Sequence, residues 1–136
     1  MNAVFLDTSG WLAALNPRET GHEASLAFYR ACIEGRKRLI TTNLVLAEMQ
    51  ILVSRARSGA EALRFLDTVY SDPTHEVVHV TRTLERAAID RWLRRFADQR
   101  LSLCDATSFE VMREQRIRQV ITRDAHFAMA GFEPLA

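Results

Sequence analysis

Short apolar runs alternate along this chain with longer stretches in which apolar residues recur every three or four positions. Short runs that end in polar or turn-forming residues are typical of strands in a buried sheet. The longer periodic stretches are typical of helices packed against such a sheet. The pattern predicts strands at residues 2–6, 38–41, 76–80 and 119–122, and a last edge strand that begins at residues 131–132.

Several helix starts carry recognisable capping residues. Thr20 with Glu23, and Ser58 with Glu61, fit the capping-box pattern, in which a hydroxyl and an acid three residues later satisfy backbone N–H groups reciprocally. Asn43 is expected to cap the apolar helix that follows the second strand. Helices are predicted at about residues 8–15, 20–35, 43–57, 58–71, 81–96, 102–115 and 125–130.

The regular alternation of strands and helices predicts a three-layer α/β fold with a mostly parallel central sheet of four to five strands flanked by helices. The sequence contains no repeat, linker or low-complexity tract, so residues 1–136 are expected to form a single domain. No stretch approaches the roughly 20 apolar residues that span a bilayer. Asp7 interrupts the first apolar run, which argues against a secretory signal. We therefore expect a soluble, cytoplasmic protein with no membrane partner.

Composition adds little to this picture. The net charge of +1 indicates no particular partner, although all but one of the 18 basic residues are arginine, with Lys37 the exception. Arginine suits nucleic acid because it contacts phosphate in a bidentate manner and stacks on bases. A gene rich in G and C explains the same bias equally well. Cys32 and Cys104 lie in helical, apolar contexts and are expected to be buried, reduced thiols.

Four acidic residues lie at or near the junctions between strands and helices. Asp7 and Asp124 follow the first and fourth predicted strands, Glu48 lies within two turns of a helix start, and Asp105 lies in the first turn of the helix that begins at Ser102. Because the carboxyl ends of parallel strands meet at one edge of a sheet, these acids are expected to converge there.

Each acid also has a simpler explanation. Asp7 and Asp124 could be helix caps, and Asp105 could close a capping box with Ser102. Glu48 fits this explanation poorly, because it is the only charged residue in the apolar segment 44–53. A helix that is apolar nearly all round is expected to be buried, where a carboxylate requires an arginine or a cation as its partner.

Taken together, the four acids indicate a metal site. Clustered carboxylates raise one another's pKa, and a hard divalent cation removes that conflict. We expect an all-oxygen site without Cys or His ligands, which favours Mg²⁺ or Mn²⁺ over zinc. Such an ion polarises a phosphoryl oxygen and helps to generate hydroxide from bound water. His126 is a candidate proton donor and Arg123 a candidate phosphate contact, although a structural or solvated role is simpler for both.

Four segments resemble the ordered motifs of PIN domains, namely residues 4–9, 41–48, 103–108 and 121–127. The resemblance covers essentially the whole chain and implies a PIN-like fold. By motif matching, Asp7, Glu48, Asp105 and Asp124 correspond to the family's acidic quartet, which is both the catalytic and the metal-binding set. Asp7 and Asp105 are expected to contact the metal directly. The hydroxyls that are expected to orient the carboxylates belong to Thr8, Ser9 and Thr107.

The length and layout are most similar to VapC-type toxins of bacterial toxin–antitoxin pairs. This resemblance implies an endoribonuclease dependent on Mg²⁺ or Mn²⁺, with water as the nucleophile and products that carry 5′-phosphate and 3′-hydroxyl ends. It also implies a homodimer and a cognate antitoxin whose tail can occupy the acidic groove. The alternative is a catalytically silent PIN-type module that binds RNA or protein.

Two other classes that gather acids at strand ends fit less well. A phosphoacceptor receiver domain needs a lysine late in the chain, whereas Lys37 lies at the start of the second predicted strand. A phosphatase with an aspartyl nucleophile favours Asp-x-Asp-x-Thr after the first strand, and the second acid is missing after Asp7.

Overall fold

The computed structural model describes residues 2–135 and contains one five-stranded sheet. The strand order is β3-β2-β1-β4-β5, and every neighbouring pair is parallel. The expectation of a mostly parallel sheet is therefore confirmed, with all five strands parallel. The strands are β1 (Ala3–Leu6), β2 (Arg38–Thr42), β3 (His75–Val78), β4 (Gln119–Ile121) and β5 (Glu133–Leu135).

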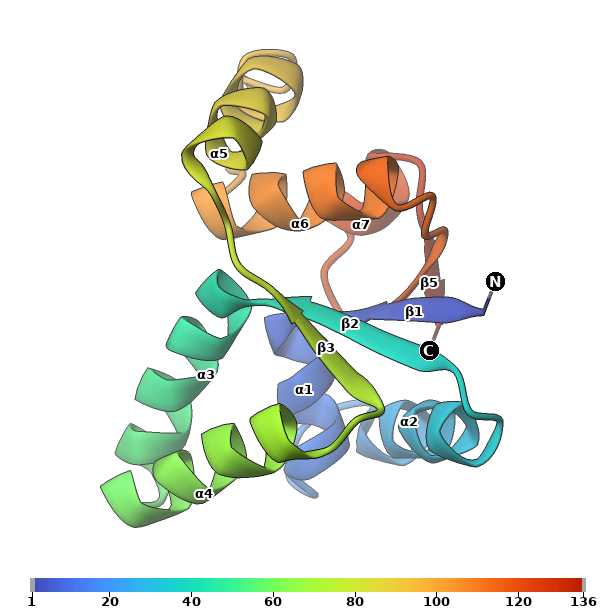
Figure 1. The fold of residues 1–136 in the computed structure, drawn as a ribbon, viewed down its shortest axis with the longest axis vertical. Helices are drawn as coiled ribbons and strands as arrows, with labels where there is room; N and C mark the ends of the chain where they lie inside the picture. Colours follow the sequence, from blue (N-terminus) through green and yellow to red (C-terminus); the bar gives the residue numbers. More distant parts are fainter. Residues whose placement is uncertain (1, 136) are drawn as a thin grey trace.

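Helices cover both faces of the sheet, as the three-layer prediction required. Figure 1 shows α1 to α4 on one side and α5 to α7 on the other. No helix within residues 2–135 is long and apolar enough to cross a lipid bilayer. The helices are α1 (Thr8–Leu15), α2 (His22–Glu34), α3 (Asn43–Ala56), α4 (Gly59–Ser71), α5 (Arg82–Ala88), the π-helical turn η1 (Ile89–Leu93), α6 (Leu103–Glu114) and α7 (His126–Met129).

Strand β1 and helix α6 are the most completely buried elements that bear on the site. All of β1 after Ala3 is fully buried, and so is most of α6. Phe109 of α6 meets Phe127 of α7 edge to face, with 4.8 Å between the ring centroids. This packing fixes α6 and α7 against the same face of the sheet, so the starts of both helices have defined positions relative to the strand ends.

The close approach of α1 to β4 depends on Gly10. A Cβ atom at this position would lie only 1.9 Å from the carbonyl oxygen of Ile121, the last residue of β4. Real Cβ atoms do not approach backbone oxygen this closely, so only glycine allows the first turn of α1 to rest on the end of β4. The residues before Gly10 are thereby held beside those that follow β4.

Two of the expected helix caps are wrong. No capping box forms at Thr20 and Glu23, because α2 begins at His22 after Gly21, whose φ of 81° lets the chain turn into the helix without a side-chain cap.

Asn43 is not the cap of α3 either. The hydroxyl of Thr42 takes that role and accepts the N–H of Val45 at 3.2 Å. The Asn43 side chain instead accepts the N–H of Val80 at 2.8 Å. Ser58 does cap α4 by accepting the N–H of Glu61.

The helix expected over residues 81–96 is interrupted by η1. Thr81 caps its start, but the regular α-helix ends at Ala88 and the chain continues in a wider π turn. Within this turn Trp92 donates from Nε1 to Glu110 of α6 at 3.0 Å. Glu110 is fully buried and also pairs with Arg91 at 3.1 Å and Arg113 at 2.8 Å. Burial alone would raise the pKa of Glu110, but the bonds from Arg113 and Trp92 outweigh it and the pKa is lowered.

Candidate active site

Asp7 lies at the carboxyl end of β1 and is almost completely buried, with 4% of its surface exposed. It occupies the position before α1, yet its side chain makes no cap hydrogen bond, so the simple capping explanation is wrong. The carboxylate oxygen Oδ2 accepts instead from Ser9 at 3.1 Å and from Thr122 at 2.9 Å. Burial raises the pKa of Asp7 to about 6, and the negative charge of Asp105 adds to this effect.

Asp105 lies in the first turn of α6 and does form the expected capping box. Its Oδ2 accepts the backbone N–H of Ser102 at 3.1 Å, while Ser102 Oγ accepts the N–H of Asp105 at 2.9 Å. The cap orients the carboxylate and does not neutralise it. Burial raises the pKa of Asp105, and the charge of Asp124 raises it further. A structural role and proximity to the other acids therefore coexist at this residue.

Asp124 follows β4 and lies beside His126. Its Oδ1 accepts the backbone N–H of His126 at 2.9 Å and lies 3.0 Å from the ring atom Nδ1 of the same residue. The N-cap position of α7 is Ala125, but the Asp124 side chain still accepts the N–H of the first residue of this helix. One potential ligand atom from each of Asp105, Asp124 and His126 lies within 4.8 Å of the others. A histidine therefore lies close to the acids, although the sequence predicted a site of oxygen ligands alone.

Glu48 approaches this edge of the sheet from α3. The prediction that Glu48 is buried in an apolar helix is wrong, because its side chain is exposed. The outward face of α3 is apolar yet open to solvent, with Ile51 46% and Leu52 37% exposed, so apolar sequence did not imply burial here. Glu48 Oε1 accepts from the hydroxyl of Thr8 at 2.5 Å, and the charge of Glu48 raises the pKa of the Cys104 thiol. Glu48 is therefore near the residues that precede or follow Asp7 and Asp105 in the sequence.

The carboxyl edge of the sheet, where Asp7, Glu48, Asp105 and Asp124 lie, is called the acidic edge below. Cys104 is buried, as expected, but it also lies at this acidic edge. Burial raises the pKa of the Cys104 thiol, and the charges of Glu48, Asp7 and Asp105 raise it further. Cys104 therefore remains a neutral thiol close to the acids. Cys104 directly precedes Asp105 in the sequence, but its apolar helical context predicted only that it is buried.

The hydroxyl residues divide into two groups. Thr8 and Ser9 contact carboxylates, in agreement with their expected role. Thr107 does not, because its hydroxyl donates to the carbonyl oxygens of Leu103 and Cys104 within α6, at 2.9 and 3.0 Å.

Thr122, which sequence reasoning did not select, takes a positioning role. It is buried at the end of β4, donates to Asp7, and accepts the backbone N–H of Asp124 at 3.0 Å. It also lies 3.0 Å from Ser9 Oγ, which accepts the backbone N–H of Arg123 at 2.8 Å. These bonds tie the end of β1 to the end of β4. The available signal was a polar residue at the carboxyl end of a buried strand, next to an acid.

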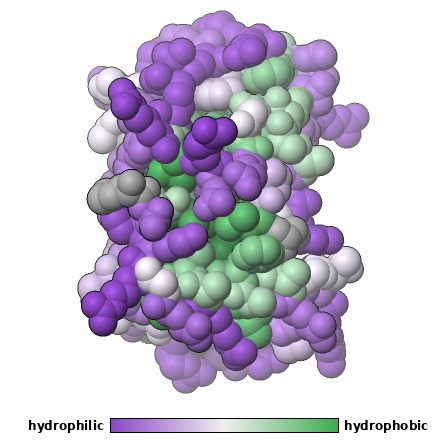
Figure 2. All heavy atoms as spheres, turned by 90° about the vertical axis from the view of Figure 1, so that its right-hand side faces the viewer, coloured by the Kyte–Doolittle hydropathy of each residue, from purple (hydrophilic) through white to green (hydrophobic). Residues whose placement is uncertain are grey.

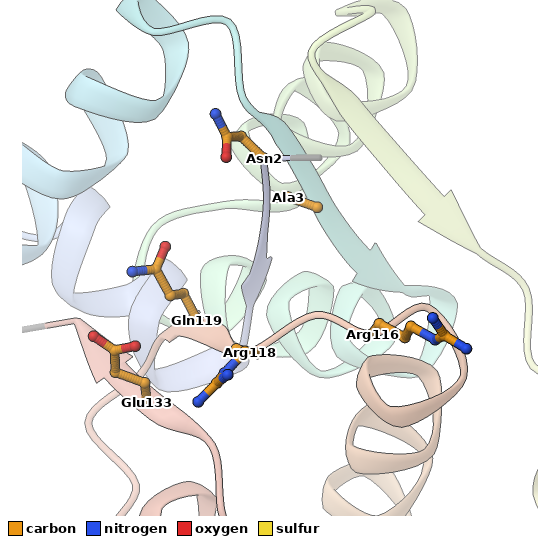
Figure 3. A pocket seen from close by; sticks show the side chains of 6 residues that line it. All are labelled: Asn2, Ala3, Arg116, Arg118, Gln119 and Glu133. Carbon is orange, nitrogen blue, oxygen red and sulfur yellow. The ribbon is translucent and has the colours of Figure 1, made fainter.

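The opposite edge of the sheet carries different chemistry. A cavity of about 220 Å³ lies there, at the amino ends of β1, β4 and β5, with Arg116, Arg118 and Glu133 in its wall (Figure 3). Figure 2 views this side of the molecule, where hydrophilic side chains surround an apolar area. None of the four predicted acids lines this cavity, so it is separate from the acidic edge.

Comparisons with known proteins identify the family and the fold. The PIN domain family model matches residues 4–133. The Mycobacterium tuberculosis protein named 23S rRNA-specific endonuclease VapC20 is 33% identical over 129 residues, which are 95% of this chain and 95% of that protein. The crystal structure of M. tuberculosis VapC20, described as a sarcin–ricin loop cleaving toxin, matches with a TM-score of 0.82 and 32% identity over 95% of each chain.

Two more distant crystal structures share the fold. FitAcB from Neisseria gonorrhoeae matches with a TM-score of 0.69 and 16% identity, over 98% of this chain and 96% of that one. VapBC2 from Rickettsia felis, bound to a DNA fragment from its promoter, matches with a TM-score of 0.70 and 15% identity, over 98% and 97% of the two chains.

Proposed function

This chain belongs to the PIN-domain family, and we propose that it is an endoribonuclease dependent on Mg²⁺ or Mn²⁺ and the toxin of a type II toxin–antitoxin pair. The observation that carries the proposal is the gathering of Asp7, Asp105 and Asp124 at the carboxyl edge of the sheet, with Glu48 joined to them through Thr8. The similarity to VapC20 over nearly the whole chain supports the same class of activity.

The residues at this edge fit a divalent cation. The pKa of Asp7 and that of Asp105 are both raised, because buried carboxylates near other negative charges are costly to ionise without a positive partner. Asp7, Asp105 and Asp124 would hold the ion, with Glu48 on its α3 side. A divalent ion bound there would polarise a phosphoryl oxygen and lower the pKa of a bound water.

The protein's own contribution is to orient the acids before RNA arrives. Ser9 and Thr122 fix one oxygen of Asp7, and Ser102 fixes one oxygen of Asp105. Carboxylates that are already held by hydrogen bonds need not reorganise when the scissile phosphate approaches. The hydrolysis products would carry 5′-phosphate and 3′-hydroxyl ends, and 23S rRNA is the first substrate to test because VapC20 is named for it.

An apolar surface supports the proposed protein partners, a cognate antitoxin and a second copy of this chain. Large hydrophobic side chains are exposed on α1, α3 and α4, namely Leu15, Ile51, Leu52, Leu63 and Tyr70. Leu15 also lines a groove of about 490 Å³, whose wall includes Pro17, Val53 and Arg57. Exposed apolar patches of this kind are typical of protein–protein contacts.

The test is cleavage of purified ribosomal and total cellular RNA with Mg²⁺ or Mn²⁺ against EDTA, beside the variant Asp7→Asn. Metal-dependent cleavage that disappears in the variant would support the nuclease. Metal binding without cleavage of any RNA would instead favour the silent binding module, and normal cleavage by Asp7→Asn would contradict the assignment of the acids.

A further inference from the structure

His126 lies at the first position of α7 and is half-buried beside two of the acids. Its backbone N–H and its ring atom Nδ1 both face Oδ1 of Asp124, at 2.9 and 3.0 Å. Within residues 2–135, Asp105, Asp124 and His126 form the one group of three such side chains whose potential ligand atoms lie this close together.

We propose that His126 gives an imidazole nitrogen to the same divalent ion as Asp105 and Asp124, and that this nitrogen makes the site prefer Mn²⁺ and Zn²⁺ over Mg²⁺. The inference rests on the proposed function, since it concerns the ion used there. It adds a nitrogen ligand to the acidic residues and predicts which metal ions the site prefers.

The spacing of the side chains matches shared coordination. Two neighbouring ligand atoms on an octahedral ion, each about 2.1 Å from it, lie about 3 Å apart. The distance between His126 Nδ1 and Asp124 Oδ1 is 3.0 Å, and all three ligand atoms fall within 4.8 Å. Little rearrangement is therefore needed for an ion to be held by all three side chains.

The chemistry of imidazole gives the selectivity. A neutral ring adds a ligand to the site without adding to the negative charge of the carboxylates. Mg²⁺ favours oxygen ligands and retains its waters, whereas imidazole suits the transition metals and Zn²⁺. The ring nitrogen that binds must be unprotonated, so coordination by Nδ1 leaves the proton of the neutral ring on Nε2.

A purely positioning role for His126 makes a different prediction. If the ring only oriented Asp124 by a hydrogen bond, its removal would lower the binding affinity for every metal ion by a similar factor. Because Oδ1 of Asp124 already accepts the backbone N–H of residue 126, part of its orientation survives any substitution of the side chain. Shared coordination therefore predicts a loss that depends on the metal.

The test is metal binding by the purified, metal-free chain. Electron spin echo spectroscopy of bound Mn²⁺ should detect an imidazole nitrogen in the wild type and in the control His79→Asn, which removes an exposed histidine. It should detect none in His126→Asn. By calorimetry, His126→Asn should bind Mn²⁺ about tenfold more weakly. Its affinity for Mg²⁺ should change less than about threefold, because asparagine still offers an oxygen.

Mn²⁺ bound by the wild type without a nitrogen signal would overturn the proposal, whatever the variants do. An equal loss of Mn²⁺ and Mg²⁺ affinity in a folded His126→Asn would also overturn it and assign a positioning role. These outcomes are separate from the proposed function, which fails if wild-type protein with bound metal cleaves no RNA.

Discussion

Replacement of Asp7 by asparagine should stabilise the metal-free protein at neutral pH, although it removes the proposed activity. The pKa of Asp7 is about 6 in the fold against 3.8 as the ordinary value, so the folded protein binds this proton more tightly than the unfolded chain. Folding stability therefore falls as the pH rises from about 4 to about 6, and the full cost of the charge is present above pH 6. A difference of about two pKa units corresponds to about 3 kcal/mol.

Asparagine recovers only part of this free energy. It is neutral and of the same shape, and its amide oxygen can accept both hydroxyl bonds that Oδ2 receives from Ser9 and Thr122, but bonds to a neutral amide are weaker than bonds to a carboxylate. This weakening costs about 1 kcal/mol, which leaves a net gain of about 2 kcal/mol in the free energy of unfolding. For a chain of this size the gain corresponds to a rise in Tm of roughly 6 °C.

The assay is thermal and urea denaturation in EDTA at pH 4 and pH 7.5. We expect Asp7→Asn to be more stable than the wild type at pH 7.5 and equally or less stable at pH 4. Asp67→Asn, which changes an exposed acid on α4, is the matched control and should show no such dependence on pH. Addition of Mn²⁺ should stabilise the wild type, by about 2.7 kcal/mol at one hundred times Kd, and stabilise the variant much less.

The reasoning would be refuted if Asp7→Asn were less stable than the wild type at pH 7.5 in EDTA. A gain of equal size at both pH values would also refute it, since that gain could not come from the ionisation of Asp7.

Three further substitutions test the supports of the site. Glu110→Ala should lower the free energy of unfolding by about 3 kcal/mol in urea denaturation, because it leaves a buried indole N–H without its acceptor; a loss below 1 kcal/mol would contradict this. Gly10→Ala should lower the free energy of unfolding by more than about 2 kcal/mol and weaken Mn²⁺ binding. Gly59→Ala, where a Cβ meets open space, should not destabilise the protein. Thr122→Val should slow RNA cleavage about tenfold or more, and equal rates for Thr122→Val and Thr107→Val would argue against this positioning role.

The sequence predicted the fold well, because the alternation of short and long apolar patterns is a property of each segment on its own. It predicted that Asp7, Asp105 and Asp124 would approach one another, because parallel strands bring their carboxyl ends to one edge. The order of the strands depends on long-range packing, which periodicity does not contain.

Most of the predictions that were wrong or missing depend on the direction in which a side chain points. The apolar residues of α3 suggested burial on all sides, whereas the direction of each side chain leaves Glu48 and Ile51 exposed. Cys104 precedes Asp105 directly and His126 lies two positions after Asp124 in the sequence, but only the packed helices determine that their side chains lie near the acids. Asn43 failed as a cap because its neighbour Thr42 has the extended backbone that the cap position needs.

The position of β1 between β2 and β4 has a consequence for the order in which the protein is made. Asp7 is synthesised before its hydrogen-bond partner Thr122, which lies more than a hundred positions later in the chain. A growing chain on the ribosome cannot bring these groups together until β4 has left the exit tunnel and paired with β1. The acidic edge is therefore assembled only after β4 has been made, and its early and late acids cannot act together before that point.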